Sequence, residues 1–314
     1  MHRFALLSLY RSLVRHRLHA ALNIGGLAVG IAVFLILGLY VRFETGYETW
    51  LPDHDKTYVV QTVWSLPDSP VNGAYPYTMG ELLNQMQQDF PGLVGTRVNG
   101  GERGGTVIVD GRATTENVAQ VDAAFLSVLR LPLVAGNAAT ALAEPGSVAI
   151  DETTARKYFG DRDPIGQKLV VAVYRADPYR VTAVFRDLPA NSDLKLSVLV
   201  PLPRLSPSEN WSHWGSTSVM TYLRFDTPAA ARAFGDRLTA FVDRRGTELA
   251  VPGGRPSDMQ QLALLPIADL HFAPQGQNSD STRLTVVTLG LVGVFTLLIA
   301  VVNYVNLATA RAGL

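Results

Sequence analysis

Two long uncharged stretches dominate the hydrophobic pattern of this chain. One covers residues 20–41 and the other covers residues 284–310, and neither contains an acidic or basic side chain. The hydrocarbon core of a bilayer is about 30 Å thick and needs roughly 20 apolar residues in a helix to cross it. The pattern therefore predicts two transmembrane helices, at residues 20–42 and 284–310, with residues 43–283 between them.

The first apolar stretch differs from a cleaved secretion signal. Such a signal has an apolar core of about 7–15 residues, followed by a cleavage site of small residues. Here the apolar run is longer, and "LYVRFETGYETW" (39–50) continues directly into charged chain. We therefore interpret the stretch as an uncleaved membrane span.

The charges beside the first span predict its orientation. Residues 1–19 contain four arginines and no acid, whereas residues 42–60 contain four acidic residues. Basic residues accumulate on the cytoplasmic side of membrane helices. We therefore expect a cytoplasmic N-terminus, an extracytoplasmic region at residues 43–283, and a second span that returns to the cytoplasm, where residues 311–314 begin a cytoplasmic segment.

The N-terminal 19 residues have a helical pattern of their own. Apolar side chains recur there at spacings of three and four residues, at Phe4, Leu7, Tyr10, Val14 and Leu18. This spacing, with arginines beside it, predicts a basic amphipathic elbow helix at residues 1–19, lying on the inner membrane face. The alternative is a flexible basic flank that only sets the topology.

The region between the spans begins and ends with a β-α-β pattern. In the first unit, "KTYVVQTVW" (56–64) and "LVGTRV" (93–98) have strand character, and "YTMGELLNQMQQDF" (77–90) has a helical period. The second unit has a strand, a helix that begins after Thr227-Pro228, and a closing strand, at residues 218–225, 229–244 and 261–267.

The residues between these two units follow a different pattern. Asp110-Gly111 predicts a β-hairpin turn. Residues 147–171 predict a strand, a helix capped by Asp151 and closed by Gly160, and another strand.

A further strand is expected at residues 179–189, after a turn at Asp177-Pro178. Because sequential elements are usually neighbours, the two flanking units can form one sheet with the middle as an insertion. We expect two subdomains, one made of 43–104 with 214–275 and one made of 105–213.

Composition removes several classes of function. The chain has 27 basic and 27 acidic residues, only 17% of its residues are charged, and it contains no cysteine. An average soluble domain is about 25% charged. The neutral balance, without a basic face or an RNA-binding motif, argues against a nucleic-acid partner. The absence of cysteine excludes disulfides, thiol catalysis and zinc–thiolate sites.

The candidate chemistry is weak throughout the chain. "GDRDPIGQKL" (160–169) does not fit a phosphate-binding loop, because five residues separate its glycines and no Lys-Ser/Thr pair follows. The histidines His54, His213 and His271 lack metal-ligand spacing, and no G-x-S-x-G sequence occurs. "NWSHWG" (210–215) suits packing better than contact with a partner or the membrane. We therefore expect no catalytic, cofactor-binding or metal residue, no cofactor, and no enzyme activity.

The chain resembles the N-terminal portion of MacB/FtsX-like ABC transporter permeases over nearly its whole length. The stretches that carry this resemblance are "FALLSLYRSLVRHRLHAALNIGGLAVGIAVFLILGLYVRFETGYETWLPDHDKTYVV" (4–60), "VDAAFLSVLRLPLVAGN" (121–137), "GSVAIDETTARKYFGDRDPIGQKL" (146–169), "YRVTAVFRDLPANSDLKLSVLVPL" (179–202) and "LHF" (270–272).

This resemblance implies a fold and a working environment. It implies an α+β periplasmic core domain with porter-like β-α-β units at 43–104 and 214–275, and with an inserted mixed α/β lobe at 105–213. Two transmembrane helices would flank the domain in a multi-pass protein of the bacterial inner membrane.

The resemblance also implies a function. A separate cytoplasmic ABC ATPase would hydrolyse ATP, and a permease dimer in the lipid bilayer would transmit its movements to the periplasmic domain. The task would be export, or the handling of lipoproteins, peptides or drugs, with a periplasmic partner or substrate. Members of the family continue after the second span, so we expect that the chain, which ends at Leu314, is a fragment or a truncated product.

The second span carries small and polar residues on one helical face. They recur at spacings of three and four residues, at Gly293, Thr296, Ala300 and Asn303. Such a stripe allows close helix approach, and an amide can bridge two helices. We expect it to face protein, either the Gly26–Gly30 face of the first span or later spans.

Two other classes of function fit parts of the pattern. Two spans around an outer domain are also the architecture of a membrane receptor ectodomain in a signalling protein. A membrane-anchored extracytoplasmic hydrolase is a third class, and the missing catalytic constellation argues against it.

The charge asymmetry predicts the result of a labelling experiment. Single cysteines at Ser69 and Ser206 should react with a membrane-impermeant thiol reagent in intact spheroplasts, because both positions lie in the expected outer region. A cysteine at Ser8 should react only after the membrane is opened. Labelling of the Ser8 position alone in intact spheroplasts would contradict this topology.

Overall fold

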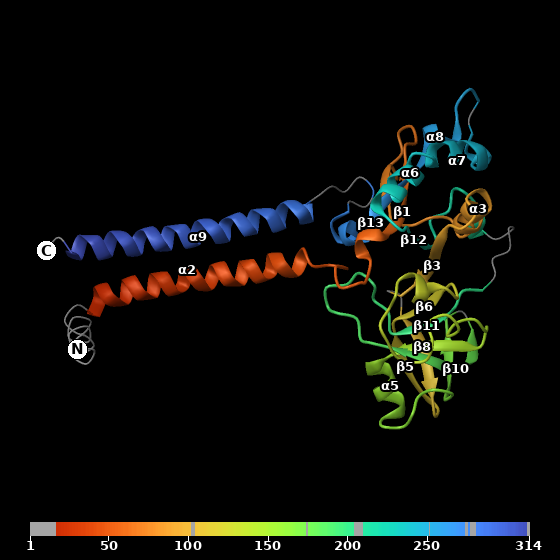
Figure 1. The fold of residues 1–314 in the computed structure, drawn as a ribbon, viewed down its shortest axis with the longest axis horizontal. Helices are drawn as coiled ribbons and strands as arrows, with labels where there is room; N and C mark the ends of the chain where they lie inside the picture. The colour runs from red at the N-terminus through yellow and green to blue at the C-terminus, as the bar shows by residue number, and fades with distance from the viewer. Residues whose placement is uncertain are drawn as a thin grey trace. The chain divides into compact units, whose positions relative to one another are not determined.

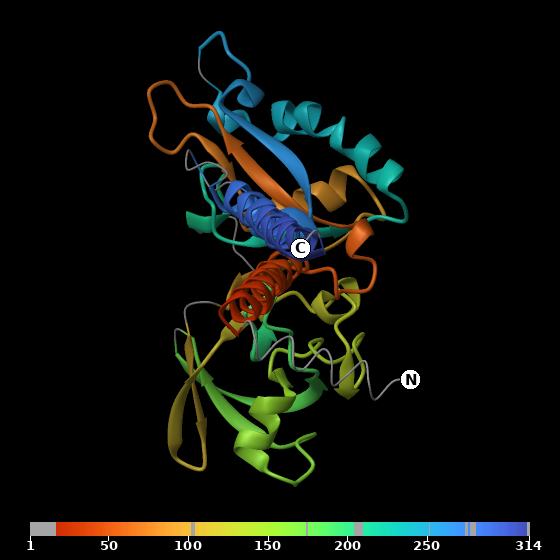
Figure 2. The same cartoon turned by 90° about the vertical axis from the view of Figure 1, so that its left-hand side faces the viewer.

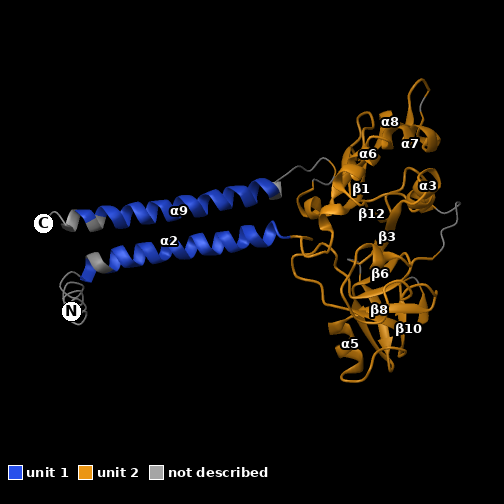
Figure 3. Cartoon of the chain, in the orientation of Figure 1, with its two compact units in different colours: residues 1–46, 280–314 blue, residues 47–279 orange. Residues whose placement is uncertain are grey.

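The computed structural model describes residues 17–101, 104–173, 175–203, 210–250, 252–273, 276 and 281–312. The chain divides into two compact units (Figure 3). The first combines residues 1–46 and 280–314, and the second is residues 47–279. The predicted elbow helix lies outside the described residues except for its last three positions, which begin the first described helix.

The first unit contains two long apolar helices, α2 (Arg17–Glu44) and α9 (Ser281–Ala312). Residues 21–44 of α2 and 283–306 of α9 are long and apolar enough to cross a membrane. Both helices extend a few residues beyond the predicted spans. Their existence and their approximate positions follow directly from the uncharged stretches.

The two helices pack through the stripe of small residues. A Cβ atom added to Gly30 of α2 would lie 2.3 Å from the Cβ atom of Ala300, so no larger residue fits there without a shift of the helices. A Cβ atom on Gly26 would lie 3.8 Å from the amide nitrogen of Asn303, and one on Gly293 would lie 3.2 Å from a leucine of α2. The expectation that the stripe of α9 faces the glycine face of the first span is confirmed at these positions.

The second unit is built on one sheet, which has 13 strands among the described residues and the order β13-β1-β12-β3-β6-β11-β8-β10-β9-β4-β5 (Figure 1). Two short strands join it at the side, with β2 beside β1 and β7 beside β10. The strands are β1 (Thr57–Trp64), β2 (Gly73–Tyr75), β3 (Val94–Gly100), β4 (Gly105–Val109), β5 (Arg112–Glu116), β6 (Val118–Val121), β7 (Leu133–Ala135), β8 (Ser147–Asp151), β9 (Lys168–Ala172), β10 (Ala176–Phe185), β11 (Val198–Pro201), β12 (Met220–Arg224) and β13 (Gln260–Pro266).

Short helices pack against this sheet. Figures 1 and 2 both show α6 and α7 alongside the strands β1 and β13. The helices are α3 (Leu82–Asp89), α4 (Phe125–Val128), α5 (Glu152–Phe159), α6 (Pro228–Gly235), α7 (Leu238–Arg245) and α8 (Pro256–Met259), and the 3-10 turns are η1 (His54–Lys56), η2 (Asn210–Ser212), η3 (Thr247–Leu249) and η4 (Ile267–Phe272).

Strands β13, β1, β12 and β3 combine two split β-α-β units. Strand β12 lies between β1 and β3 and is antiparallel to β1 and to β3, so β1 and β3 run parallel across it. Strand β1 lies between β12 and β13 and is antiparallel to both, so β12 and β13 also run parallel to each other. Each β-α-β unit thus supplies the strand that completes the other, a ferredoxin-like arrangement. Helices α3, α6 and α7 cover it and enclose a core that includes Met86, Leu223 and Phe241.

The remaining strands extend the sheet through β6. Residues Val98 of β3 and Val121 of β6 are paired partners, so the sheet continues without a gap into β11, β8, β10, β9, β4 and β5. Beside this joint the buried Arg97 donates from Nε to Oδ2 of Asp122, over 3.0 Å, and from its terminal nitrogen to the carbonyl of Gly80, over 2.5 Å. A charge-assisted contact therefore reinforces the pairing of β3 with β6.

Local signals in the middle region predicted its elements correctly. Asp110 and Gly111 adopt positive φ angles of 49° and 76°, as a type I′ hairpin requires, and they join β4 to β5. The side chain of Asp151 accepts a 2.7 Å hydrogen bond from the Thr154 amide and caps α5. Gly160 ends that helix at a φ of 59°. The expected fold class, a mixed α/β domain with apolar helices at both ends, is confirmed.

Two local expectations about helices are wrong. The helix expected at 229–244 is two helices, α6 and α7, separated at Asp236 and Arg237. Gly235 and Asp236 are weak helix formers, and the break places the Arg237 guanidinium 4.4 Å from the ring centre of Phe90. The helix expected from residue 77 begins at Leu82, because Thr78 forms a β-bridge before it.

The turn expected at Asp177-Pro178 is also wrong. Both residues lie within β10, where Pro178 is the paired partner of Val170 in β9. The pairing of β10 with β8 starts only at Arg180, so at Pro178 the strand has β9 alone as its neighbour. Proline has no N–H group to donate. It is tolerated at such an edge because no second neighbouring strand requires that donor.

An ion-pair cluster joins α3 to α7 on the outside of this core. Asp89, at the end of α3, accepts hydrogen bonds from Nε of Arg244 at 3.0 Å and from Nε of Arg245 at 3.1 Å, as well as closer bonds from both terminal nitrogens. The Asp89 side chain is only 11% exposed. Hydrogen bonds from Arg245 and then Arg244 lower the pKa of Asp89 to about 2.

We predict that Asp89→Asn lowers the free energy of unfolding by about 2 kcal/mol at neutral pH. A carboxylate with a lowered pKa stabilises the fold fully above the unfolded pKa of 3.8 and loses this contribution as the pH falls toward about 2. The difference between wild type and variant should therefore shrink below pH 3.8. Urea unfolding of the full chain in micelles, followed by tryptophan fluorescence, measures it.

Asp258→Asn is the matched control for this substitution. Its 3.3 Å ion pair with Arg255 joins two side chains that are 48% and 70% exposed, so the change should stay within about 0.5 kcal/mol. An equal effect of the two substitutions, or a pH-independent difference for Asp89→Asn, would contradict the assignment.

Candidate functional site

Three connecting segments of the second unit meet at one place. Residues 47–51 lead out of the segment that follows α2, residues 191–194 lie between β10 and β11, and η4 precedes the chain that continues to α9. We call this meeting point the connector junction and define it by Tyr47, Glu48, Ser192, Asp193 and His271.

Glu48 is the buried centre of the connector junction. Its side chain has no solvent exposure, and the Ser192 hydroxyl donates to its two carboxylate oxygens over 2.8 and 3.1 Å. The Asp193 amide donates to Oε1 at close range, and the Leu194 amide reaches the same atom at 3.4 Å. The carboxylate therefore holds three consecutive residues of the segment between β10 and β11.

The backbone at Glu48 contributes a second constraint. Its φ angle is 55°, in the left-handed region that side chains other than glycine rarely adopt. Such a conformation costs roughly 1–3 kcal/mol and persists where surrounding contacts hold it in place. Here the Glu48 amide donates to the Asn191 carbonyl at 3.4 Å, and the Glu48 carbonyl accepts from the Leu51 amide at 3.1 Å.

Burial dominates the electrostatics of Glu48. Removal from water disfavours the charged carboxylate and raises its pKa, while the hydrogen bonds from Ser192 and Asp193 act in the opposite direction. The negative charge of the Asp193 side chain raises the pKa further. Burial also raises the pKa of Tyr222, and the charges of Glu48 and Asp193 add to this shift.

Residues 47–51 and η4 are the two connectors of the junction. His271 brings the second of them, η4, into contact with the other segments. Its Nδ1 lies 3.2 Å from Oδ1 of Asp193, and its ring stacks on Tyr47 with the ring centres 3.4 Å apart and the planes inclined by 12°. The other carboxylate oxygen of Asp193 is buried and has no hydrogen-bond partner. His271 therefore contacts both other segments of the connector junction.

Apolar packing anchors both connectors to the same core. Leu51, which follows Glu48, and Ile267 and Leu270 of η4 belong to one buried cluster with Phe125 and Phe185. A movement of either connector must therefore displace this core or the segment at 191–194. Both connectors and the segment at 191–194 are therefore held together by one apolar core and by the Glu48 carboxylate.

The candidates of the sequence analysis are not brought together. His54 contacts the Leu51 carbonyl at 3.1 Å, His213 lies 3.4 Å from Oε2 of Glu248, and His271 belongs to the connector junction. In the described part of the chain, no group of three or more His, Cys, Asp or Glu side chains is placed to hold a metal ion.

The stretch at 160–169 is a turn from a helix into a strand. Gly160 closes α5, and Lys168 is the first residue of β9. A phosphate-binding loop connects in the opposite order, from a strand into the N-terminus of a helix whose amides meet the phosphates. This geometry agrees with the mismatch in glycine spacing.

Sequence reasoning did not identify Glu48, Ser192 or Asp193 as site residues. No recognisable motif lies near these residues in the sequence. Glu48 looks like any other acidic residue beside a membrane span. One signal was present, because the junction residues lie in three of the stretches that carry the family resemblance, at 4–60, 179–202 and 270–272.

Comparison with known proteins identifies the family. The profile described as "MacB-like periplasmic core domain" matches residues 20–241. The chain therefore belongs to the MacB-like periplasmic core domain family. This family contains permease components of ABC-type transporters. No match to a curated protein sequence is found.

A solved structure shows the same fold. A domain of a protein described as a permease, from Porphyromonas gingivalis, has 23% identity and a TM-score of 0.56, and the match covers 76% of this chain and 98% of that one.

Two further structures have TM-scores below 0.5 and indicate only a loose resemblance. The periplasmic region of MacB from Actinobacillus actinomycetemcomitans has 14% identity and a TM-score of 0.43, with 74% of this chain and 92% of that chain covered. The extracellular domain of the noncanonic ABC-type transporter YknZ from Gram-positive bacteria has 16% identity and a TM-score of 0.41, with 60% and 95% covered.

The raised pKa of Glu48 predicts a specific pH dependence of stability. The folded state binds this proton more tightly than the unfolded state, so the contribution of Glu48 is largest below the ordinary pKa of 4.5 and falls as the pH rises through the raised value. Glu48→Gln cannot ionise. It should gain stability relative to wild type with rising pH, by about 1.4 kcal/mol for each pH unit between the unfolded and folded pKa values.

Urea unfolding of both proteins across the acidic to neutral range tests this expectation. Glu144→Gln is the control, because Glu144 is exposed and its side chain is outside the connector junction. A constant difference between wild type and Glu48→Gln at every pH would show that Glu48 titrates alike in the folded and unfolded states.

Proposed function

We propose that this chain is part of a membrane permease subunit that couples ATP hydrolysis by a separate cytoplasmic ATPase to movements of its periplasmic domain. Family membership supports the class of protein. The connector junction supports the mechanism, because Glu48 and His271 tie the two connectors to the same segment at 191–194. A displacement of the membrane helices would reach that segment from both sides.

The proposal includes a topology and an assembly. The N-terminus is cytoplasmic, the core domain is periplasmic, and the permease is a multi-pass dimer in the inner membrane. The sequence contains no phosphate-binding loop, and the proposal assigns ATP binding to the partner subunit. The cargo belongs to the lipoproteins, peptides or drugs, or the domain acts on a periplasmic partner.

We assign separate roles to two subdomains within the periplasmic domain. Residues 43–104 and 214–275 form a porter-like part that receives both connectors, and residues 105–213 form the inserted lobe. The pairing of β3 with β6 and the contact of Arg97 with Asp122 connect the two parts. Movement at the connector junction would therefore change the position of both parts through one sheet.

A receptor ectodomain would use the same junction in the opposite direction. A ligand on the outer domain would move the two connectors, and the spans would carry that signal inward. The two functions differ in their dependence on an ATPase, and this difference provides the test.

We predict that His271→Ala uncouples the transporter. The substitution removes the 3.2 Å contact with Asp193 and the stacking on Tyr47, while the apolar anchors of η4 remain. In proteoliposomes that contain the permease and its ABC ATPase, transport per ATP hydrolysed should fall by about fivefold or more. ATP hydrolysis itself should continue.

His54→Ala is the matched control. His54 is also half-buried and bonds to a backbone carbonyl, but it lies outside the connector junction. Equal transport per ATP hydrolysed in the two variants would contradict a mechanical role of the connector junction. Failure of any ABC ATPase to associate with the permease would favour the receptor.

A further inference from the structure

The chain beyond the second connector is attached to the sheet once more before α9 begins. Gly276 lies four residues after the end of η4, and its amide donates a 2.9 Å hydrogen bond to the carbonyl of Ala74 in β2. The two residues form an isolated antiparallel β-bridge. We call this attachment the glycine anchor and define it by Gly73, Ala74, Tyr75 and Gly276.

The glycine anchor needs glycine on both of its sides. A Cβ atom on Gly73 would lie 2.1 Å from the carbonyl oxygen of Gly276, and one on Gly276 would lie 2.4 Å from the phenol oxygen of Tyr75. Atoms cannot pack this closely, so a side chain at either position forces its neighbour to move. Both glycines also have positive φ angles, of 116° and 68°, which glycine adopts without a steric cost. The close approach therefore fixes one position of the chain at Gly276 against β2.

Strand β2 joins the glycine anchor to the middle of the porter-like part. Its three residues pair with residues 62–64 of β1. Strand β1 also pairs with all seven residues of β13, and η4 begins directly after β13. Strand β1 is thus linked to the chain on both sides of η4, to β13 before it and, through β2, to Gly276 after it.

This double attachment limits where η4 can lie. Four residues span at most about 14 Å when fully extended, so Phe272 at the end of η4 stays within that distance of Gly276. His271 precedes Phe272, and its contact with Asp193 depends on the placement of η4. Because the chain is already fixed at Gly276, less conformational entropy is lost when His271 meets Asp193 and Tyr47.

We propose that the glycine anchor positions η4 for its contact at the connector junction, and that Gly73 and Gly276 are positioning residues that act through His271. The anchor holds the chain between η4 and α9 in one register on β2, which keeps His271 beside Asp193 when a displacement arrives through α9. The inference deepens the proposed function, on which it rests, by adding a second attachment that coupling requires.

Gly73→Ala tests the glycine anchor without the ATPase. The added Cβ atom collides with the carbonyl of Gly276 and should open the bridge. In the full chain in lipid nanodiscs, hydrogen exchange of the Gly276 amide should become about fivefold faster or more, as expected for one lost hydrogen bond. Gly92→Ala is the matched control, because Gly92 also has a positive φ, of 83°, but an added Cβ atom there meets nothing within 4 Å.

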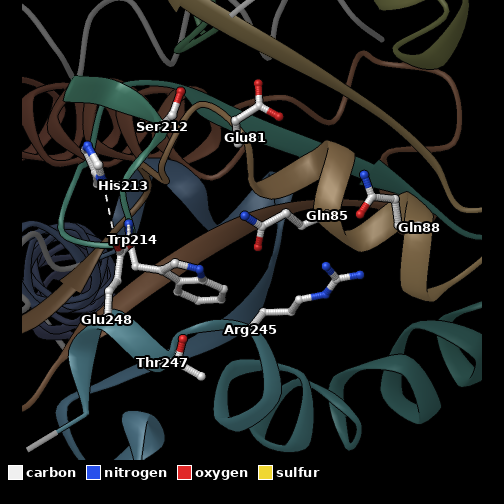
Figure 4. A pocket seen from close by; sticks show the side chains of 9 residues that line it. All are labelled: Glu81, Gln85, Gln88, Ser212, His213, Trp214, Arg245, Thr247 and Glu248. Atoms are coloured by element: carbon white, nitrogen blue, oxygen red, sulfur yellow. Dashed lines mark hydrogen bonds and ion pairs between the residues drawn. The ribbon is translucent and has the colours of Figure 1, made fainter. Parts of the chain in front are cut away.

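A polar cavity in the porter-like part supplies a second control. Its volume is about 390 Å³, and Gln85, Gln88 and Trp214 are among the residues that line it (Figure 4). No residue drawn in Figure 4 belongs to β2, to a connector or to the glycine anchor. Gln88 is exposed on α3, so Gln88→Ala should change neither the exchange of the Gly276 amide nor transport.

Transport per ATP hydrolysed tests the positioning role, in proteoliposomes that contain the permease and its ABC ATPase. Gly73→Ala should lower this ratio by about threefold or more. Gly276→Ala, which displaces Tyr75 instead of the backbone at Gly276, should act in the same direction. In the His271→Ala background, Gly73→Ala should cause no further loss, because both substitutions remove the same contact, whereas a general structural defect would add to the loss.

Three results would overturn the inference. They are unchanged exchange of the Gly276 amide in Gly73→Ala, unchanged transport per ATP despite faster exchange, and an additive loss in the double variant. Each of them leaves the proposed function intact as long as His271→Ala alone uncouples transport. Normal coupling in His271→Ala would contradict the proposed function itself, so the two failures are distinguishable.

Discussion

A carboxylate that is fully buried needs donors for its oxygens, and this requirement holds the connector junction together. Glu48 obtains its donors from one hydroxyl and two backbone amides of the segment at 192–194. Removing one partner of such a buried network leaves the others unsatisfied, which costs more than the bond itself contributes. The chain that follows the first span is therefore held to a segment more than 140 positions away in the sequence.

The connector junction is attached to a domain that is built on one continuous sheet. Strand β1 lies between the two strands of the second β-α-β unit, and β12 lies between the two strands of the first, so three strand pairings join the units. The same sheet continues through β6 into β11, β8, β10, β9, β4 and β5. Close packing makes such an assembly move as a body rather than deform gradually. Under the proposed function, this property would let a displacement at the connector junction reach both ends of the sheet.

The two carboxylates of the connector junction differ in how well they are satisfied. Glu48 accepts hydrogen bonds from Ser192, Asp193 and Leu194, whereas one oxygen of Asp193 is buried without a partner. Native proteins rarely leave such groups unpaired, because the lost solvation is not recovered. Glu48 is therefore the better satisfied of the two carboxylates.

The sequence by itself determined the elements whose signals are local. Uncharged length predicted α2 and α9, the Asp110-Gly111 turn predicted the hairpin, and the caps at Asp151 and Gly160 predicted α5. Each depends on a period or a turn within about 30 residues. The same reasoning failed at Pro178 in β10. A proline is acceptable in this strand because β10 has a neighbour on only one side there, and the sequence does not show this.

Only the tertiary structure decided the sites. Glu48 meets Ser192, and Gln85 shares a cavity with Trp214, over sequence separations that no periodicity reports. A glutamate can be a solvated surface charge or a buried hydrogen-bond acceptor such as Glu48. Which of the two it becomes depends on the donors that surround it after folding. Burial and hydrogen-bond partners arise only in the folded chain. The residue types alone therefore do not predict the chemistry of these side chains.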